Sequence, residues 1–204
     1  MQEIVRQQLT NSLSVMQQVI GDSGLIDAVA EAGSATARAL LAGNKLMVAG
    51  NGGSAADAQH LVAEFVSRLT VDRPALRAVA LTTDSSILTA IGNDYGYEHV
   101  FERQVEALGQ PGDVFLGIST SGRSPNVVRA LELCRRSGIL TIGFSGNRGG
   151  AMAALCDYNI IIPSAVTQHI QECHLALEHI FCMIVERCYF GAEMFETPLA
   201  RAKA

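Results

Sequence analysis

Residues 45–56 of this chain, KLMVAGNGGSAA, pass from a short apolar run through a glycine-rich turn into the start of a helical pattern. The apolar run over 45–49 has the length and composition of a buried strand, and the pattern after the turn predicts a helix over 54–69. A strand that leads through a turn into a helix is the repeating unit of an α/β domain. The N–H groups of such a turn, together with a helix N-terminus, form a natural site for an anion.

A second turn of the same kind has the sequence ISTSGRS over residues 118–124, and it follows an apolar run over 114–118. Four of its residues carry hydroxyl groups, and Ser124 is the predicted N-cap of a helix that begins at Pro125. A phosphate could accept hydrogen bonds from the hydroxyls and from the helix amides together. Serine and glycine also occur in turns that bind nothing, but two such turns in one small domain favour a ligand.

Three further apolar runs complete a set of five predicted strands, at residues 78–81, 140–144 and 158–162. Residues 1–43 have the apolar spacing of two helices with a break near 21–24, and a last helix is predicted over 167–190. Strands that alternate with helices predict a parallel sheet covered on both faces. The predicted fold is therefore α/β, a three-layer αβα sandwich with a five-stranded parallel sheet, preceded by N-terminal helices.

Composition narrows the class of protein. A chain of 204 residues with 49% hydrophobic and 5% aromatic residues is typical of one compact domain with an aliphatic core. A net charge of −5 and the lack of a basic cluster argue against nucleic acid as a partner. Five cysteines without a C-x-x-C pair predict reduced thiols. The polar N-terminus and the absence of a long apolar run predict a cytoplasmic protein with no membrane partner.

The first turn also matches the dinucleotide-binding pattern G-x-G-x-x-A through Gly50, Gly52 and Ala55. That pattern requires an acidic residue about twenty positions later, at the end of the second strand. Asp72 lies before that strand, and Asp84 lies some thirty positions on. A phosphosugar ligand is therefore favoured over a dinucleotide.

The helix after the first turn carries His60 and Glu64, whose four-residue spacing places both side chains on one face. An imidazole and a carboxylate in that arrangement can serve as acid and base or as two metal ligands. A solvated pair without a function is the alternative. The closeness of the pair to the glycine turn favours a functional site.

The last predicted helix is unusually polar among its aliphatic residues. Gln171 and His179 are eight residues apart, about 12 Å along a helix axis, so a shared small ligand requires long side chains that lean together or contributions from two chains. For His174 and Glu178, the interpretation that we prefer is an ordinary i,i+4 pair.

Four segments, at residues 49–60, 90–97, 112–124 and 170–179, carry a resemblance to a known family. In them the chain resembles the sugar isomerase (SIS) domain family, and within it the bacterial phosphoheptose isomerases, over essentially its whole length. The resemblance implies a flavodoxin-like fold and a single SIS domain over residues 1–204. It further implies a homotetramer, in which the helices of 1–43 serve oligomerisation, while 44–204 form the α/β core and the C-terminal helix.

The activity that the resemblance implies is the isomerisation of sedoheptulose 7-phosphate, a small sugar phosphate, to D-glycero-D-manno-heptose 7-phosphate through an enediol. The product would enter the heptose of the lipopolysaccharide core. Glu64 and His179 are the implied catalytic residues, as base and as acid. The implied substrate-binding residues are Asn51, Gly52, Gly53, Glu64, Asn93, Asp94, Ser119, Thr120, Ser121, Ser124 and Gln171. One zinc ion per subunit is implied, with His60, Glu64, Gln171 and His179 as ligands.

One position departs from the family pattern, because His169 stands where relatives have Arg or Lys. An ordinary histidine titrates near about 6.5, so the cation there would be partly lost at neutral pH. Two other functions remain open at this point. One is a non-catalytic SIS adaptor of the DnaA-initiator-associating type, against which the presence of Glu64 argues, and the other is an isomerase or sensor of a different sugar phosphate.

Overall fold

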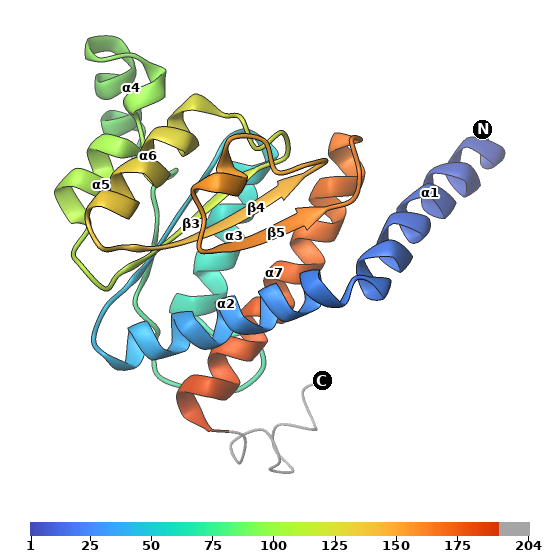
Figure 1. The fold of residues 1–204 in the computed structure, drawn as a ribbon, viewed down its shortest axis with the longest axis horizontal. Helices are drawn as coiled ribbons and strands as arrows, with labels where there is room; N and C mark the ends of the chain where they lie inside the picture. The colour runs from blue at the N-terminus through green and yellow to red at the C-terminus, as the bar shows by residue number, and fades with distance from the viewer. Residues whose placement is uncertain (192–204) are drawn as a thin grey trace.

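The computed structural model describes residues 1–191, and these contain one parallel sheet of five strands in the order β2-β1-β3-β4-β5 (Figure 1). The strands are β1 (Leu46–Gly50), β2 (Ala78–Ala80), β3 (Val114–Ser119), β4 (Leu140–Gly146) and β5 (Tyr158–Ile162). The five predicted strands are thereby confirmed to within two residues at each end. The predicted α/β core and C-terminal helix span residues 44–204, of which residues 192–204 lie outside the part of the chain that the structure describes.

Helices cover both faces of the sheet, as the three-layer prediction requires (Figure 1). One face carries α2 (Ser23–Leu41), α3 (Gly53–Val66) and α7 (Thr167–Phe190). The other face carries α5 (Glu102–Leu108) and α6 (Pro125–Arg136), with α4 (Ser85–Asp94) and the short 3-10 turn Tyr97–His99 beside them. Helix α1 (Gln2–Gly21) contacts α2 and α7 and extends away from the sheet. No helix within residues 1–191 has both the length and the apolar character needed to cross a membrane.

The central strands are buried on both faces, and their residues divide between two cores. In β1, Leu46 and Val48 join the cluster under α2, α3 and α7, whereas Met47 and Ala49 join the cluster under α5 and α6. This division follows from the two-residue period of a strand. It explains why the strands appear in the sequence as continuous apolar runs.

Two helix boundaries have local causes. The break between α1 and α2 falls at Asp22, the N-cap of α2, whose carboxylate accepts a hydrogen bond from the Leu25 amide at 3.0 Å. Helix α3, predicted over 54–69, ends at Val66. It stops early because the Arg73 guanidinium donates to the carbonyl oxygens of Glu64 and Phe65, which the amides of a longer helix would have used.

The interpretation of His174 and Glu178 as an ordinary i,i+4 pair is wrong. Both side chains are buried in the core, and Glu178 has no hydrogen-bond partner among the described residues. The Nε2 atom of His174 donates to the Ser145 carbonyl oxygen at 3.0 Å. Burial lowers the pKa of His174 to about 4. Burial also raises the pKa of Glu178 to about 8, with the charge of Asp57 adding to the effect. The shared face of the two residues packs against the protein instead of facing water.

We expect the buried His174 to contribute a loss of stability as the pH falls, and the buried Glu178, whose pKa is raised, to contribute a gain over the same range. The pKa of His174 lies below the ordinary value of 6.5, so the unfolded chain binds the proton more tightly, and stability that is present above pH 6.5 is lost as the pH falls. In urea unfolding, the free energy of unfolding of the wild type minus that of the His174→Gln variant should fall by about 2 kcal/mol between pH 7 and pH 5, a difference from which the opposite contribution of Glu178 cancels. His174→Gln, which keeps a donor for the Ser145 carbonyl, should lose that part of the pH dependence. An unchanged slope in the variant would contradict the assignment.

Candidate active site

The two glycine and hydroxyl turns lie side by side at the carboxyl edge of the sheet. Strands β1 and β3 are neighbours with Gly50 opposite Ile118, so the turns that follow them begin at the same level. The chain leaves β1 toward β2 on one side and leaves β3 toward β4 on the other. This reversal of strand order is the place where open parallel sheets bind ligands.

A pair of asparagines joins the two turns. The Asn51 side-chain amide donates to Asn126 Oδ1 at 2.9 Å, and the Asn126 amide donates to Asn51 Oδ1 at 2.8 Å. The Tyr97 hydroxyl also donates to Asn51 Oδ1, at 3.0 Å. Sequence analysis did not identify Asn126 or, individually, Tyr97. Tyr97 falls in the 90–97 segment, whereas no local pattern distinguishes Asn126 from any other residue in the first turn of a helix.

The second turn gathers hydroxyl groups at the N-terminus of α6. Ser119 Oγ lies 2.9 Å from Ser124 Oγ and 3.5 Å from Ser121 Oγ. Ser124 is the N-cap residue, as predicted, but its side chain makes no capping bond to the helix and pairs with Ser119 instead. Gly122 permits this tight turn because it has a φ of +62° and packs against the backbone of Gly149. Hydroxyls gathered at a helix N-terminus are well suited to phosphate, but Pro125 has no amide hydrogen and the Val127 amide donates to Asn126 Oδ1 at 3.0 Å, so the hydroxyls supply most of the donors here.

A cavity of about 170 Å³ adjoins the serine turn. Thr120, Ser121 and Arg123 line it from the turn, and Asn147 lines it from the end of β4. Thr167 at the first turn of α7 lines its opposite side. The start of α7 therefore stands next to the predicted phosphate site.

His60, Glu64 and His179 form a cluster between α3 and α7, with one donor atom from each residue lying within 4.8 Å of the other two. His60 Nε2 lies 2.8 Å from His179 Nε2 and 3.6 Å from Glu64 Oε1. The side chains of His60 and Glu64 are 43% and 18% exposed, so the cluster is open to a ligand. An acid and a base that share one opening are the components of proton-transfer chemistry.

The donor set of this cluster fits a zinc ion. Zinc binds histidine nitrogen and carboxylate oxygen at about 2.0–2.2 Å, which places neighbouring ligand atoms of a tetrahedron about 3.3 Å apart. The distances of 2.8 and 3.6 Å between the donor atoms lie on either side of that value. Three of the four predicted metal ligands are thereby together in one chain.

Gln171 contacts the glycine turn instead. Its side-chain amide packs so closely against Gly53, the first residue of α3, that a Cβ atom there would overlap it. Gln171 of α7 lies at the level of Gly53 of α3, and eight residues later His179 lies at the level of His60. The two helices therefore run side by side in the same direction. Both predicted residues of α7 thus reach the site from the same chain as the two turns.

Asn93 and Asp94 lie at the end of α4, where both are exposed. The Asn93 amide donates to Asp94 Oδ1 at 2.7 Å. Within residues 1–191, no hydrogen bond joins either side chain to the two turns. Tyr97, which bonds to Asn51, is the link between this segment and the site.

A pair of acidic residues adjacent to the cluster was not predicted. Asp57 lies on α3 one turn before His60, and its Oδ2 atom is buried without a hydrogen-bond partner in the described chain. Burial raises the pKa of Asp57, while the nearby His60 opposes the shift. The buried Glu178 of α7 repels it. The spacing of Asp57, His60 and Glu64 on one helix face was the signal that could have included Asp57.

His169, the departure from the family pattern, is buried beside α1. Its Nδ1 atom lies 3.1 Å from Ser12 Oγ and 3.1 Å from Glu172 Oε2. The residue therefore connects α1 to the first turn of α7. Its contacts are at a helix junction and not with the serine turn.

A parallel α/β sheet with two glycine and hydroxyl turns where its strand order reverses, next to a histidine and carboxylate cluster, is the architecture of an α/β domain that binds a small ligand at this edge. The SIS domain family model matches residues 9–146. The phosphoheptose isomerase of Aneurinibacillus thermoaerophilus is 50% identical over 93% of this chain and 96% of that protein. Phosphoheptose isomerase 2 of Campylobacter jejuni is 54% identical over 92% and 93% of the two chains. The solved phosphoheptose isomerase GmhA of Neisseria gonorrhoeae aligns with a TM-score of 0.85 at 41% identity, covering 91% and 98%.

The chain belongs to the SIS domain family, and within it to the phosphoheptose isomerases. It is therefore an isomerase, as its resemblance to that family implied, and an enzyme instead of an adaptor.

We expect Gly53→Ala to reduce activity without reducing stability. Alanine is a better helix former than glycine at the first residue of α3, but its methyl group would displace the flexible end of Gln171. Steady-state kinetics should show a lower kcat/KM, while thermal unfolding should show an unchanged or higher Tm. Gly21→Ala, where a Cβ meets nothing within 4 Å, is the matched control. Wild-type kcat/KM in Gly53→Ala would contradict a role for Gln171.

Proposed function

We propose that this enzyme converts sedoheptulose 7-phosphate into D-glycero-D-manno-heptose 7-phosphate. The observation that carries the proposal is the His60, Glu64 and His179 cluster next to two anion-binding turns, in a chain about half identical to phosphoheptose isomerases over nine-tenths of its length. The proposed role of the product is to supply heptose for the lipopolysaccharide core.

Substrate binding is proposed to begin at the phosphate. Ser119, Thr120, Ser121 and Ser124 would hold it at the N-terminus of α6, where three of these hydroxyls gather. The proposed contacts to the sugar come from Asn51, Gly52, Gly53, Glu64, Asn93, Asp94 and Gln171. An anchor distant from the reacting carbons orients the substrate and lowers the entropic part of the barrier.

Isomerisation requires a proton to leave one carbon and return to the next. We propose that the Glu64 carboxylate removes the proton from C1 of the ketose while His179 donates a proton to the carbonyl oxygen at C2, which yields an enediol. His179 then takes the proton from the hydroxyl at C1, and Glu64 returns its proton to C2. Every bond broken is matched by one formed, so no oxidant or reductant is needed.

The proposed cofactor is one zinc ion per subunit, held by His60, Glu64 and His179; Gln171, the fourth ligand that the resemblance implies, lies beside Gly53 in this chain, about two helical turns from these three residues. The support is the fit of the three donors to a zinc site. When bound, the ion would supply a positive charge that stabilises negative charge on the substrate oxygens. Without it, the dipoles of His60 and Gln171 are the groups placed to do so.

We propose a single SIS domain that assembles as a cytoplasmic homotetramer through its N-terminal helices, residues 1–43. The support is the composition of the outer face of α1, where large apolar side chains are mostly in water. Those exposed by 57–67% are Ile4, Val5, Leu9, Leu13 and Ile20. An apolar face of this kind marks an interaction surface.

We expect Glu64→Gln to abolish most turnover, because an amide cannot accept the carbon-bound proton. NMR of sedoheptulose 7-phosphate incubated with the enzyme should show the aldoheptose phosphate form, and the rate should fall by about 10²- to 10⁴-fold in the variant. His179→Gln should have an effect of similar size. Glu106→Gln, at an exposed ion pair on α5, should be as active as wild type. No turnover by the wild type would shift the proposal to another sugar phosphate.

Zinc content has a separate test. We expect elemental analysis of purified protein to find one zinc per subunit and His60→Ala to lose it, because one of the three clustered donors is removed. Dialysis against a chelator should lower activity, and added zinc should restore it. Protein without zinc that turns over at the full rate would refute the cofactor while leaving the isomerase intact.

A further inference from the structure

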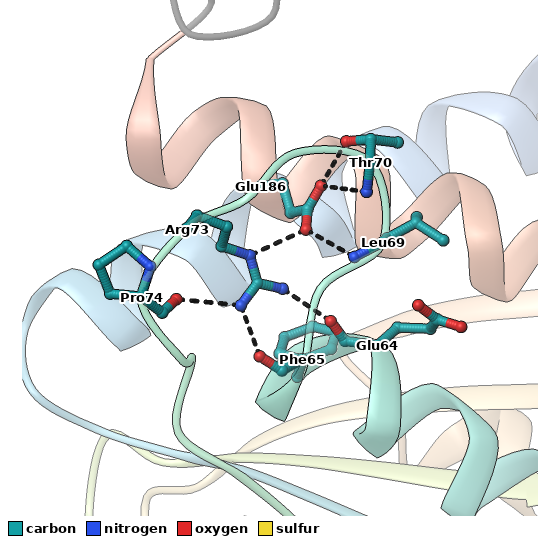
Figure 2. A network of polar contacts seen from close by, with 7 residues as sticks. All are labelled: Glu64, Phe65, Leu69, Thr70, Arg73, Pro74 and Glu186. Carbon is teal, nitrogen blue, oxygen red and sulfur yellow. Dashed lines mark hydrogen bonds and ion pairs between the residues drawn. The ribbon is translucent and has the colours of Figure 1, made fainter. Parts of the chain in front are cut away.

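The connection between α3 and β2 contains a buried ion pair outside the cluster and the two turns. Arg73 Nε donates to Glu186 Oε1 at 2.8 Å, and each side chain is 1% exposed (Figure 2). Removing two charges from water is costly unless their remaining hydrogen-bonding groups are also satisfied. Both charged groups have further hydrogen-bond partners, and these partners belong to the end of α3 and to the loop that follows it.

Arg73 binds the C-terminal end of α3. One guanidinium nitrogen donates to the Glu64 carbonyl oxygen at 2.7 Å, and the other donates to the Phe65 carbonyl oxygen at 2.7 Å. The latter nitrogen also donates to the Pro74 carbonyl oxygen, at 3.1 Å. The last carbonyls of a helix lack partners within the helix and carry its negative dipole end, which a cation complements; the Phe65 carbonyl oxygen also accepts from the Leu76 amide at 3.0 Å.

Glu186 binds the same connection from α7. Its two carboxylate oxygens accept from the amides of Leu69 and Thr70 at 3.1 and 3.3 Å, and from the Thr70 hydroxyl at 2.6 Å. Figure 2 shows the pair between the end of α3, the loop and α7. One ion pair therefore fastens the end of α3 and the loop that follows it to α7, more than a hundred positions later in the sequence.

We infer that Arg73 is a positioning residue for Glu64, and this inference rests on the proposed function. The carboxylate of Glu64 points away from the guanidinium in Figure 2, so Arg73 acts through the main-chain carbonyl and not on the charge. Glu186 lies two helical turns after His179, on the same side of α7. The Arg73–Glu186 pair, here called the clamp, thus ties the helix that carries the base to the helix that carries the acid, at the Glu64 main chain itself and about 10 Å along α7 from His179.

The planar guanidinium is essential to this role. Its nitrogens point in different directions within one plane, which lets Arg73 reach Glu186 and two helix carbonyls at once. Lysine keeps the charge but offers a single nitrogen, so it cannot span these acceptors. A displacement of about 1 Å in a reacting group is enough to lower a rate by about 100-fold.

The test compares Arg73→Lys and Glu186→Gln with wild type in steady-state turnover of sedoheptulose 7-phosphate. We expect kcat per folded subunit to fall about 10- to 100-fold, while KM changes less than about threefold because the phosphate turn lies on α6. Arg77→Gln is the matched control, since Arg77 lies on the same connection and donates to the Gly43 carbonyl. It should retain the wild-type kcat.

Hydrogen exchange gives a second readout that needs no turnover. Arg73→Lys should speed amide exchange over residues 61–67 of α3 and leave α6 unchanged. Unchanged amide exchange in Arg73→Lys would overturn the inference, and so would a lower Tm combined with the wild-type kcat. Failure of both variants to fold would also overturn it, because the ion pair would then serve stability alone. Inactive wild type would refute the proposed function alone, and the exchange measurement would then decide on the clamp.

Discussion

The parallel packing of α7 against α3 is the contact on which the candidate active site depends. It aligns Gln171 with Gly53 and His179 with His60, so residues more than a hundred positions apart meet at two levels along one pair of helices. The three-residue cluster needs both helices, because α3 carries the Glu64 carboxylate and the His60 imidazole while the second imidazole, His179, comes from α7. Any change in the spacing of the two helices changes the geometry of the acid and base.

The sheet and the helices contribute different parts of the site. The switch in strand order between β1 and β3 brings two turns together, and the reciprocal hydrogen bonds between Asn51 and Asn126 hold them there. These turns rest on buried central strands, which are rigid. The cluster of His60, Glu64 and His179 depends on how two helices pack, so we expect the buried ion pair that joins the end of α3 to α7 to influence its geometry.

The fold could be predicted from the sequence because its signals are local. Apolar runs, glycine turns and helical spacing are properties of neighbouring residues, and they determined the strands and the two anion-binding turns. The contacts that were missed join distant residues, such as Asn51 with Asn126 and Arg73 with Glu186. His174 and Glu178 show the same limit: their spacing predicts a shared face, but only the tertiary packing decides that this face is buried.

The separation of the two parts of the site bears on the length of the substrate. Gly53 and His60 are seven residues apart on α3, which corresponds to about 10 Å along the axis. The serine turn lies beside the start of α3, because Asn51 bonds to Asn126. A substrate whose phosphate occupies that turn while its carbonyl reaches the cluster must therefore extend over most of this distance. A long open-chain sugar phosphate meets the requirement and a triose phosphate does not, so the alignment of α3 with α7 agrees with a substrate of the length of a heptose phosphate.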